Sequence, residues 1–261
     1  MTNKKVFVIV KKYLSLPSLT NTILTMKRSA KVMAVVMLMT ALVFTVGCKK
    51  DKNDVPGGGG DGADTREYVD LGLPSGLLWA TCNIGAQTPE AYGNYFAWGE
   101  IQPKTNYKWS TYKYCNGSYN TITKYCYDPH CGYEGYTDTL TVLLPDDDAA
   151  AVIWGDGWRM PTYEDWDELL QNTTLTRTTQ NGVNGVLFTA INDSTSLFLP
   201  CAGYYLDGDL MYAGEEGYYW SSSLKTNTAY EAKALVIYSD YFTYSSSRDA
   251  GQCIRPVRSA R

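Results

Sequence analysis

Histidine and strong charge of either sign are scarce in this chain. His130 is the single histidine among 261 residues. The sequence therefore argues against a metal site built on histidines and against a histidine-dependent catalytic triad. The formal net charge is only −4, from 23 lysines and arginines against 27 acidic residues. With no basic field, we expect no nucleic-acid partner.

Phenylalanine is also scarce, at six residues, whereas the chain has 22 tyrosines and seven tryptophans. Tyrosine and tryptophan combine an apolar body with a polar tip, which suits binding surfaces as well as cores. The aromatic composition therefore indicates a ligand-binding surface in addition to a packed core.

The apolar run 32–46 is short for a membrane span. A basic stretch precedes it, and Gly47 and Cys48 follow it, which is the order of an export signal. The end of the run resembles the lipobox of bacterial lipoproteins, in which the cysteine is lipidated, although Thr45 stands where leucine is usual. We expect lipidation at Cys48. An ordinary secretory signal or a short anchor is the alternative.

The chain divides into three parts. Residues 1–48 form the signal region, with Met26 as the better start, and residues 49–65 are a Gly-, Asp- and Lys-rich flexible linker. Residues 66–261 form the folded domain. A lipid on Cys48 would attach this domain to a membrane, so we expect an outer-membrane lipoprotein of the cell envelope, exposed at the surface.

Two short helices are predicted. Thr162 is a helix N-cap with Asp165 as its capping-box partner, and an apolar face follows at helical spacing. The residues of that face are Tyr163, Trp166, Leu169 and Leu170. The second helix covers 149–154, with Asp146, Asp147 and Asp148 before it and Gly155 after it. These three carboxylates could instead bind calcium, but they lack the spacing of a calcium loop.

Alternating apolar residues between turn signals predict several strands. Their ranges are 68–71, 77–82, 186–191, 196–199, 218–222, 233–238 and 252–257. Antiparallel strands with short turns and two short helices indicate an α+β domain with long loops.

Six cysteines remain when Cys48 is set aside, and six permit fifteen pairings. Cys115 and Cys126 bracket a turn-rich loop and are the first candidate disulfide. Cys201 and Cys253 lie in candidate core strands and are the second. Several of the six could instead be buried thiols.

Six segments together resemble the Fibrobacter succinogenes major paralogous domain family of gut Bacteroidetes lipoproteins. They are residues 69–76, 79–83, 97–100, 157–162, 219–223 and 254–257. The resemblance covers nearly all of 67–258 and implies a C-type lectin-like fold. It implies no particular activity, because the family has no general biochemical assignment.

Two departures from calcium-dependent lectins decide the metal prediction. Tyr219, Trp220 and Ser221 stand where those lectins carry Trp-Asn-Asp, and the motif Glu-Pro-Asn is missing. The nearest match, at residues 102–104, ends in a lysine. We therefore expect neither a metal nor a cofactor.

The function predicted from the sequence is the binding of a glycan or protein ligand without calcium, and not catalysis. Tyrosine, serine and asparagine gather on the expected loops between 218 and 248, as they do in antibody paratopes. The residues expected to bind the ligand are Tyr218, Tyr219, Tyr238, Asp240, Tyr241, Tyr244 and Arg248. This region also resembles the variable segment of lectin-like proteins diversified by retroelements.

Two other classes of function stay open. The domain could be a structural or adhesin subunit of a surface assembly. It could also be a hydrolase that uses a carboxylate pair drawn from Asp207, Asp209, Glu215 and Glu216. If the loops near the C-terminus do not bind the ligand, the Tyr- and Cys-rich loop 114–136 is the next candidate.

Overall fold

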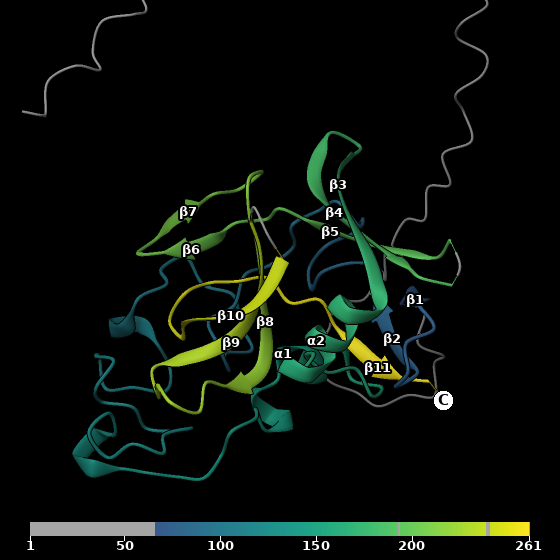
Figure 1. Cartoon of the computed structure of the whole chain (residues 1–261). Helices are drawn as coiled ribbons and strands as arrows, with labels where there is room; N and C mark the ends of the chain where they lie inside the picture. The colour runs from purple at the N-terminus through teal and green to yellow at the C-terminus, as the bar shows by residue number, and fades with distance from the viewer. Residues whose placement is uncertain (1–65, 193, 239–240, 261) are drawn as a thin grey trace, which may run out of the picture. The chain divides into compact units, whose positions relative to one another are not determined.

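The computed structural model describes residues 66–192, 194–238 and 241–260 (Figure 1). All of them belong to the unit Val46–Arg261. The predicted signal region 1–48, its Cys48 and the linker 49–65 lie outside the described residues. Among the residues that are described, no helix is long and apolar enough to cross a membrane.

Short antiparallel strands dominate the domain and form four small sheets among the described residues. In spatial order these are β1 (Tyr68–Asp70), β2 (Leu77–Ala80) and β11 (Val257–Ser259); β3 (Thr173–Gln180), β4 (Val183–Ala190) and β5 (Ser196–Pro200); β6 (Tyr204–Leu206) and β7 (Asp209–Met211); and β10 (Tyr241–Ser247), β9 (Glu231–Ile237) and β8 (Gly217–Leu224). The helices are α1 (Ala149–Trp154) and α2 (Tyr163–Asn172), with short 3-10 turns at Trp109–Thr111, Tyr133–Gly135 and Pro145–Asp147. The predicted α+β class is confirmed.

Helix α2 begins where the sequence predicts it. Thr162 Oγ1 accepts a hydrogen bond from Asp165 N at 3.2 Å, and Asp165 Oδ2 accepts one from Thr162 N at 2.6 Å. This is a complete capping box. The ring of Trp166 lies 4.6 Å from that of Trp79 in β2 and 6.0 Å from that of Tyr219 in β8. The helix thereby packs two of the sheets onto one core.

Helix α1 is also present where it was predicted. Of the three aspartates before it, Asp148 alone caps the helix. Asp148 Oδ1 accepts hydrogen bonds from Ala150 N at 2.8 Å and Ala151 N at 3.0 Å. The same carboxylate accepts a bond from Met160 N at 2.8 Å. Gly155 ends the helix at φ 61°, a conformation that favours glycine. Asp148 thus fixes the helix and the segment after it together.

Two hairpins were not predicted, although their turns carry a readable signal. Asn181 and Gly182 join β3 to β4 at φ 48° and 83°, and Asp207 and Gly208 join β6 to β7 at φ 51° and 94°. Asn-Gly and Asp-Gly are the preferred pairs for two-residue hairpin turns, because both positions need positive φ. The threonine-rich β3 and the three-residue β6 and β7 lack the apolar alternation that marks a strand.

Two further expectations need correction near the C-terminus. Residues 241–247 are not loop but strand β10, which pairs with β9 from Tyr241↔Ile237 to Ser247↔Glu231. The strand expected at 252–257 is instead a chain of single bridges, to Phe96 and to Tyr219, before β11 begins at Val257. Pro256 has no N–H to donate, which interrupts a ladder at this point.

The two ends of the domain meet on β2. Trp79 pairs with Val69 of β1 on one side and with Val257 of β11 on the other. Trp79 is fully buried, as are Trp166 and Trp220. The first and last strands of the domain, β1 and β11, are thus held together by β2. The other helices and strands lie between β2 and β11 in the sequence.

Candidate functional site

Tyr219 and Arg248 do not belong to an exposed surface, which corrects their predicted role in ligand binding. Both are 0% exposed. Successive side chains of a strand point to opposite faces. Tyr219 pairs with Leu235 on the face that α2 covers, whereas its neighbour Tyr218 pairs with Val236 on the other face.

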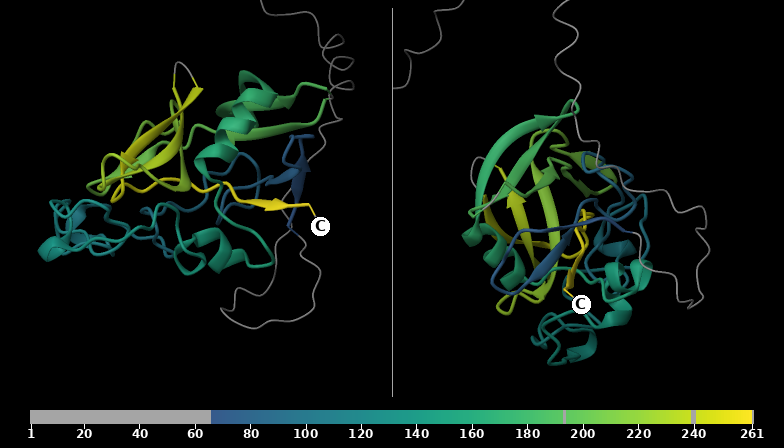
Figure 2. Two further views of the ribbon diagram at one scale, coloured as in Figure 1. Left: turned by 60° about the horizontal axis from the view of Figure 1, so that its bottom comes forward. Right: turned by 90° about the vertical axis from the view of Figure 1, so that its right-hand side faces the viewer.

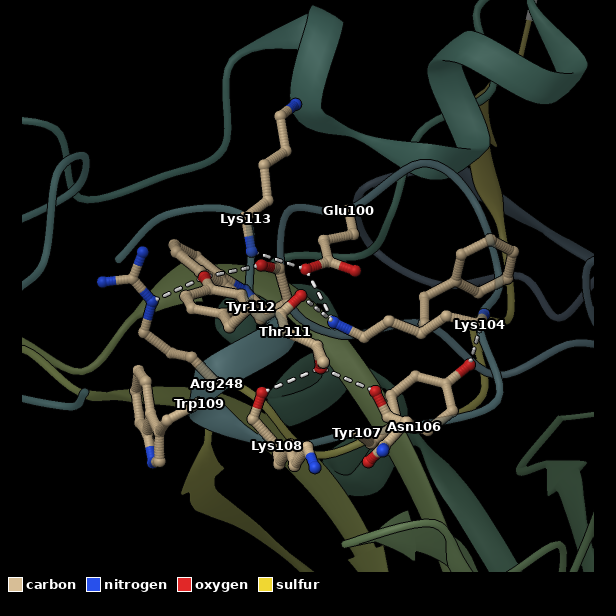
Figure 3. A network of polar contacts seen from close by, with 12 residues as sticks. Glu100, Lys104, Asn106, Tyr107, Lys108, Trp109, Thr111, Tyr112, Lys113 and Arg248 are labelled. Atoms are coloured by element: carbon tan, nitrogen blue, oxygen red, sulfur yellow. Dashed lines mark hydrogen bonds and ion pairs between the residues drawn. The ribbon is translucent and has the colours of Figure 1, made fainter. Parts of the chain in front are cut away.

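Arg248 lies at the end of β10 and points inward, as Figure 3 shows beside Tyr112. Its guanidinium lies 4.8 Å from the ring centre of Trp98 and 5.3 Å from that of Tyr112. It donates to Tyr112 Oη and to the main-chain oxygens of Lys124, Tyr125 and Ala229, at 2.9 to 3.1 Å. A buried charge needs such partners. Arg248 therefore joins three chain segments and has a structural role.

The loop 100–113 beside this arginine is closed by its own polar contacts. Glu100 Oε1 accepts from Lys104 Nζ at 2.9 Å and from Lys113 N at 2.8 Å (Figure 3). Lys104 Nζ also donates to Thr111 O at 3.0 Å. The buried carboxylate of Glu100 and the ammonium group of Lys104 are thus engaged with each other, and their network holds the loop closed.

The other predicted ligand-binding residues are exposed, half-buried or outside the described part. Tyr238 is 53% exposed and Tyr244 is 55% exposed. Tyr218 is half-buried. Asp240 lies outside the described residues, and the structure describes Tyr241 by its backbone alone. The predicted residues therefore do not form one continuous surface.

Tyr218 instead joins two tyrosines that the sequence did not indicate. Its ring lies 4.6 Å from that of Tyr204 in β6, and the Tyr204 ring lies 6.1 Å from the ring of Tyr212 in a stacked arrangement. Tyr212 is 46% exposed. Three aromatic rings from β6, the end of the hairpin and β8 thus gather at one place in the domain.

Glu216 adds a carboxylate to these rings. Tyr218 Oη donates to Glu216 Oε2 at 2.6 Å. Burial, followed by the bond to Glu216, raises the pKa of Tyr218 well above its ordinary value. Burial, with Tyr212 and Glu216 nearby, also raises the pKa of Tyr204. Both phenols stay neutral at physiological pH and can donate or accept hydrogen bonds.

The β6–β7 hairpin extends this group with apolar side chains. Tyr204 pairs with Met211, so the two share a face, and Leu206 lies two residues further along the same face. Leu206 and Met211 are each 37% exposed. We call Tyr204, Leu206, Met211, Tyr212, Glu216 and Tyr218 the hairpin surface. Figure 1 shows β6 and β7 beside one end of the β8–β10 sheet.

The opposite face of the hairpin fixes it to the core. The ring of Tyr205 lies 4.9 Å from that of Tyr95 and 5.5 Å from that of Tyr107. Tyr205 also exchanges two main-chain hydrogen bonds with Gly251, at 2.8 and 2.9 Å. A Cβ on Gly251 would lie 2.7 Å from the Tyr107 ring, so this close approach requires glycine. The hairpin surface is thus carried on a rigid support.

Three of the carboxylates weighed as calcium ligands or as part of a catalytic pair, Asp147, Asp148 and Glu216, have other partners. Asp147 accepts bonds from Tyr114, Tyr125 and Lys124, while Asp148 caps α1. Glu216 accepts from Tyr218. No group of three or more His, Cys, Asp or Glu residues that could hold a metal occurs among the described residues.

Neither expected disulfide is present. Cys115, Cys126, Cys201 and Cys253 are free thiols. Cys115 Sγ donates to Trp109 O at 3.1 Å, whereas Cys126 Sγ donates to Asp128 O at 3.1 Å, so the two thiols are held at different carbonyls. Cys201 and Cys253 are buried, and burial raises the pKa of Cys253 to about 12. They behave as small core residues.

A cavity of about 390 Å³ lies beside α1, lined by Val142, Pro145, Trp158 and Arg159 among others. Two of its charged groups, Asp148 and Arg159, are already engaged. Asp148 accepts main-chain N–H groups, and Arg159 donates to Asp165 at 2.6 Å. The hairpin surface is therefore the better candidate site.

No family model, curated protein or solved structure matches this chain.

Proposed function

We propose that this chain is a ligand-binding module of the cell envelope, held by a lipid on Cys48, with a C-type lectin-like fold. Its ligand is a glycan or a protein, and binding needs no calcium. The export signal and the linker before the domain support the location. The small antiparallel sheets and few helices agree with the proposed fold.

The hairpin surface is the observation that carries the binding function. It places Tyr204, Tyr212 and Tyr218 together, half-buried or exposed, with a carboxylate among them. Tyrosine offers a large contact area with little loss of rotamer freedom. Because Tyr205 already fixes the hairpin to the core, little conformational entropy of the hairpin is lost when a ligand binds. Such pre-formed aromatic groups are typical of binding hot spots.

The engaged carboxylates support binding without calcium. Asp147 and Asp148 already accept hydrogen bonds from side chains and main-chain N–H groups. A metal would have to displace these partners.

A screen of the full chain against glycan and protein arrays tests the proposal. For a ligand found there, the double variant Tyr204→Ala/Tyr212→Ala is expected to lose on the order of 1–4 kcal/mol of binding free energy, because aromatic hot spots carry such amounts. Tyr244→Ala is the matched control, since Tyr244 is a comparably exposed tyrosine on β10. Calorimetry measures the ligand affinity of both variants, and adding a chelator should not change the affinity of either.

Unchanged affinity in both the control and the double variant would place the site elsewhere. Loss in Tyr244→Ala alone would restore the β10 surface that the sequence indicated. Glycan cleavage during the screen would replace a binding module with a hydrolase.

A further inference from the structure

The segment 114–138 is a long loop with little regular structure. Its described secondary structure is one 3-10 turn, Tyr133–Gly135, and isolated bridges at Ile122. Figure 2 shows this part of the chain, in teal, at the periphery of the domain and outside its sheets. Four of its tyrosines are exposed by 37 to 51%: Tyr119, Tyr127, Tyr133 and Tyr136. Loops of this length are usually functional or held by added constraints.

Two cysteines of this loop converge on Asp128. Cys126 Sγ donates to the main-chain oxygen of Asp128 at 3.1 Å, and Cys131 N donates to the same oxygen at 3.0 Å. Cys131 Sγ lies 3.6 Å from Asp128 Oδ2. The sulfur of Cys126 and the backbone of Cys131 are therefore separated by a single shared acceptor atom.

The same two side chains pack in one small apolar cluster. Cys126 is buried with Ile122 and Ala229, and Cys131 packs against this group from its edge. The backbone around Cys126 is fixed by Asp138, whose carboxylate accepts from Tyr125 N at 2.7 Å and Cys126 N at 3.1 Å. Gly132, next to Cys131, has no room for a Cβ, because Tyr136 O would lie 1.8 Å from it. Both cysteines are thus held in place before any bond forms.

We propose that Cys126 and Cys131 form an intrachain disulfide when the domain meets a disulfide oxidant. The two thiols lose two protons and two electrons, one S–S bond forms, and a disulfide such as oxidised glutathione is reduced to two thiols. The thiolate of the half-buried Cys131 attacks one sulfur of oxidised glutathione, forms the mixed disulfide and releases one glutathione thiol; the thiolate of the buried Cys126 then attacks Cys131 Sγ and releases the second. Exported domains meet such oxidants.

The expected effect of the bond is to fix the exposed tyrosines of the loop. The disulfide closes a covalent ring of residues 126–131, which includes Tyr127, and restricts the unfolded chain. Burial raises the pKa of both thiols, and Asp128 adds to the effect at Cys131. Only a small fraction of either thiol is therefore thiolate at neutral pH, so we expect the oxidation to be slow.

The test uses the reduced full chain, incubated with oxidised glutathione, alkylated and cleaved with trypsin. Residues 125–159 contain no lysine or arginine before Arg159, so Cys126 and Cys131 fall in one tryptic peptide, and Cys115 falls in the preceding one. We expect peptide 125–159 to lose both alkyl labels and two hydrogens, with no second peptide attached. Cys115→Ser is the matched control and should behave in the same way.

Three outcomes would overturn the proposal. One is full alkylation of both cysteines after oxidation. Another is a link between peptide 125–159 and the peptide with Cys115. The third is a stable glutathione adduct on Cys131 while Cys126 remains alkylated. A melting curve of the oxidised wild-type chain, compared with its reduced form, is a second measurement, and the disulfide should raise the melting temperature.

Discussion

At the scale of single residues, the hydroxyl of tyrosine explains why this chain has so few phenylalanines. Several buried tyrosines donate to main-chain oxygens of the loops: Tyr95 to Ala202 at 2.5 Å, Tyr107 to Tyr95 at 2.6 Å, Tyr112 to Trp98 at 2.8 Å and Tyr219 to Pro200 at 2.5 Å. Carbonyl groups of irregular segments have no ladder partner, and a buried one left unpaired is costly. Tyrosine fills the core and supplies this partner at once.

Tyr219→Phe tests this role. Removing the hydroxyl takes away one of two donors to Pro200 O, because Ala202 N also donates to it at 2.9 Å, so we expect the free energy of unfolding to fall by about 0.5–1.5 kcal/mol. Ligand binding should be unchanged, because Tyr219 is fully buried. Tyr238→Phe, at a position that is 53% exposed, is the control and should change stability by less than about 0.5 kcal/mol. Urea unfolding of both variants measures the difference, and equal stability would contradict the role.

At the scale of elements, the start of α2 depends on the charge of Asp165. Burial of this carboxyl opposes ionisation, but hydrogen bonds from Arg159 and Thr162 outweigh it and lower its pKa below the ordinary value. A carboxyl whose pKa is lowered on folding stabilises the fold above its ordinary pKa. That stability is lost as the pH falls through the folded-state pKa.

Asp165→Asn should therefore lower the free energy of unfolding by about 1–2 kcal/mol near neutral pH, as expected for a lost cap and ion pair. The difference from wild type should narrow as the pH falls below the ordinary carboxyl pKa of 3.8 and through the lower folded-state pKa, where the wild-type carboxyl becomes protonated. Urea unfolding across this pH range measures it. Glu164→Gln, an exposed carboxylate of the same turn, is the control. A difference that does not change with pH would show that packing, and not charge, is responsible.

At the scale of the whole molecule, the predicted linker would set how far the domain can reach from a membrane. The sequence of 49–65 contains nothing to bury, and the lipid expected on Cys48 precedes it. A single acyl chain binds a membrane only reversibly, so firm attachment needs the several chains of a mature lipoprotein.

Cys48→Ala should release the protein from membrane fractions and abolish acyl labelling. Fractionation with metabolic labelling measures both, and the uncleaved precursor, recognised by its larger mass, has to be counted separately. Normal acylation of this variant would place the lipid on another residue and contradict the prediction.

The sequence by itself determined the local features of this protein. Both helices begin at the predicted caps, because capping by Thr162 and Asp148 depends on residues within three positions. The α+β class follows from short alternating segments between turns. The hairpins β3–β4 and β6–β7 could also have been predicted from the sequence, because Asn181-Gly182 and Asp207-Gly208 are local signals for hairpin turns.

Only the tertiary structure decided which aromatic residues are exposed. Tyr218 and Tyr219 are neighbours of the same type. The sequence around them does not indicate that α2 covers the face of the sheet on which Tyr219 lies. Arg248 resembles a surface cation in sequence, but Trp98 and Tyr112 enclose it from 150 and 136 residues away. Tyr204 and Tyr212 meet Tyr218 through strand pairing and packing. Burial depends on contacts between distant segments, and the strand alternation that the sequence shows leaves open which face becomes the core.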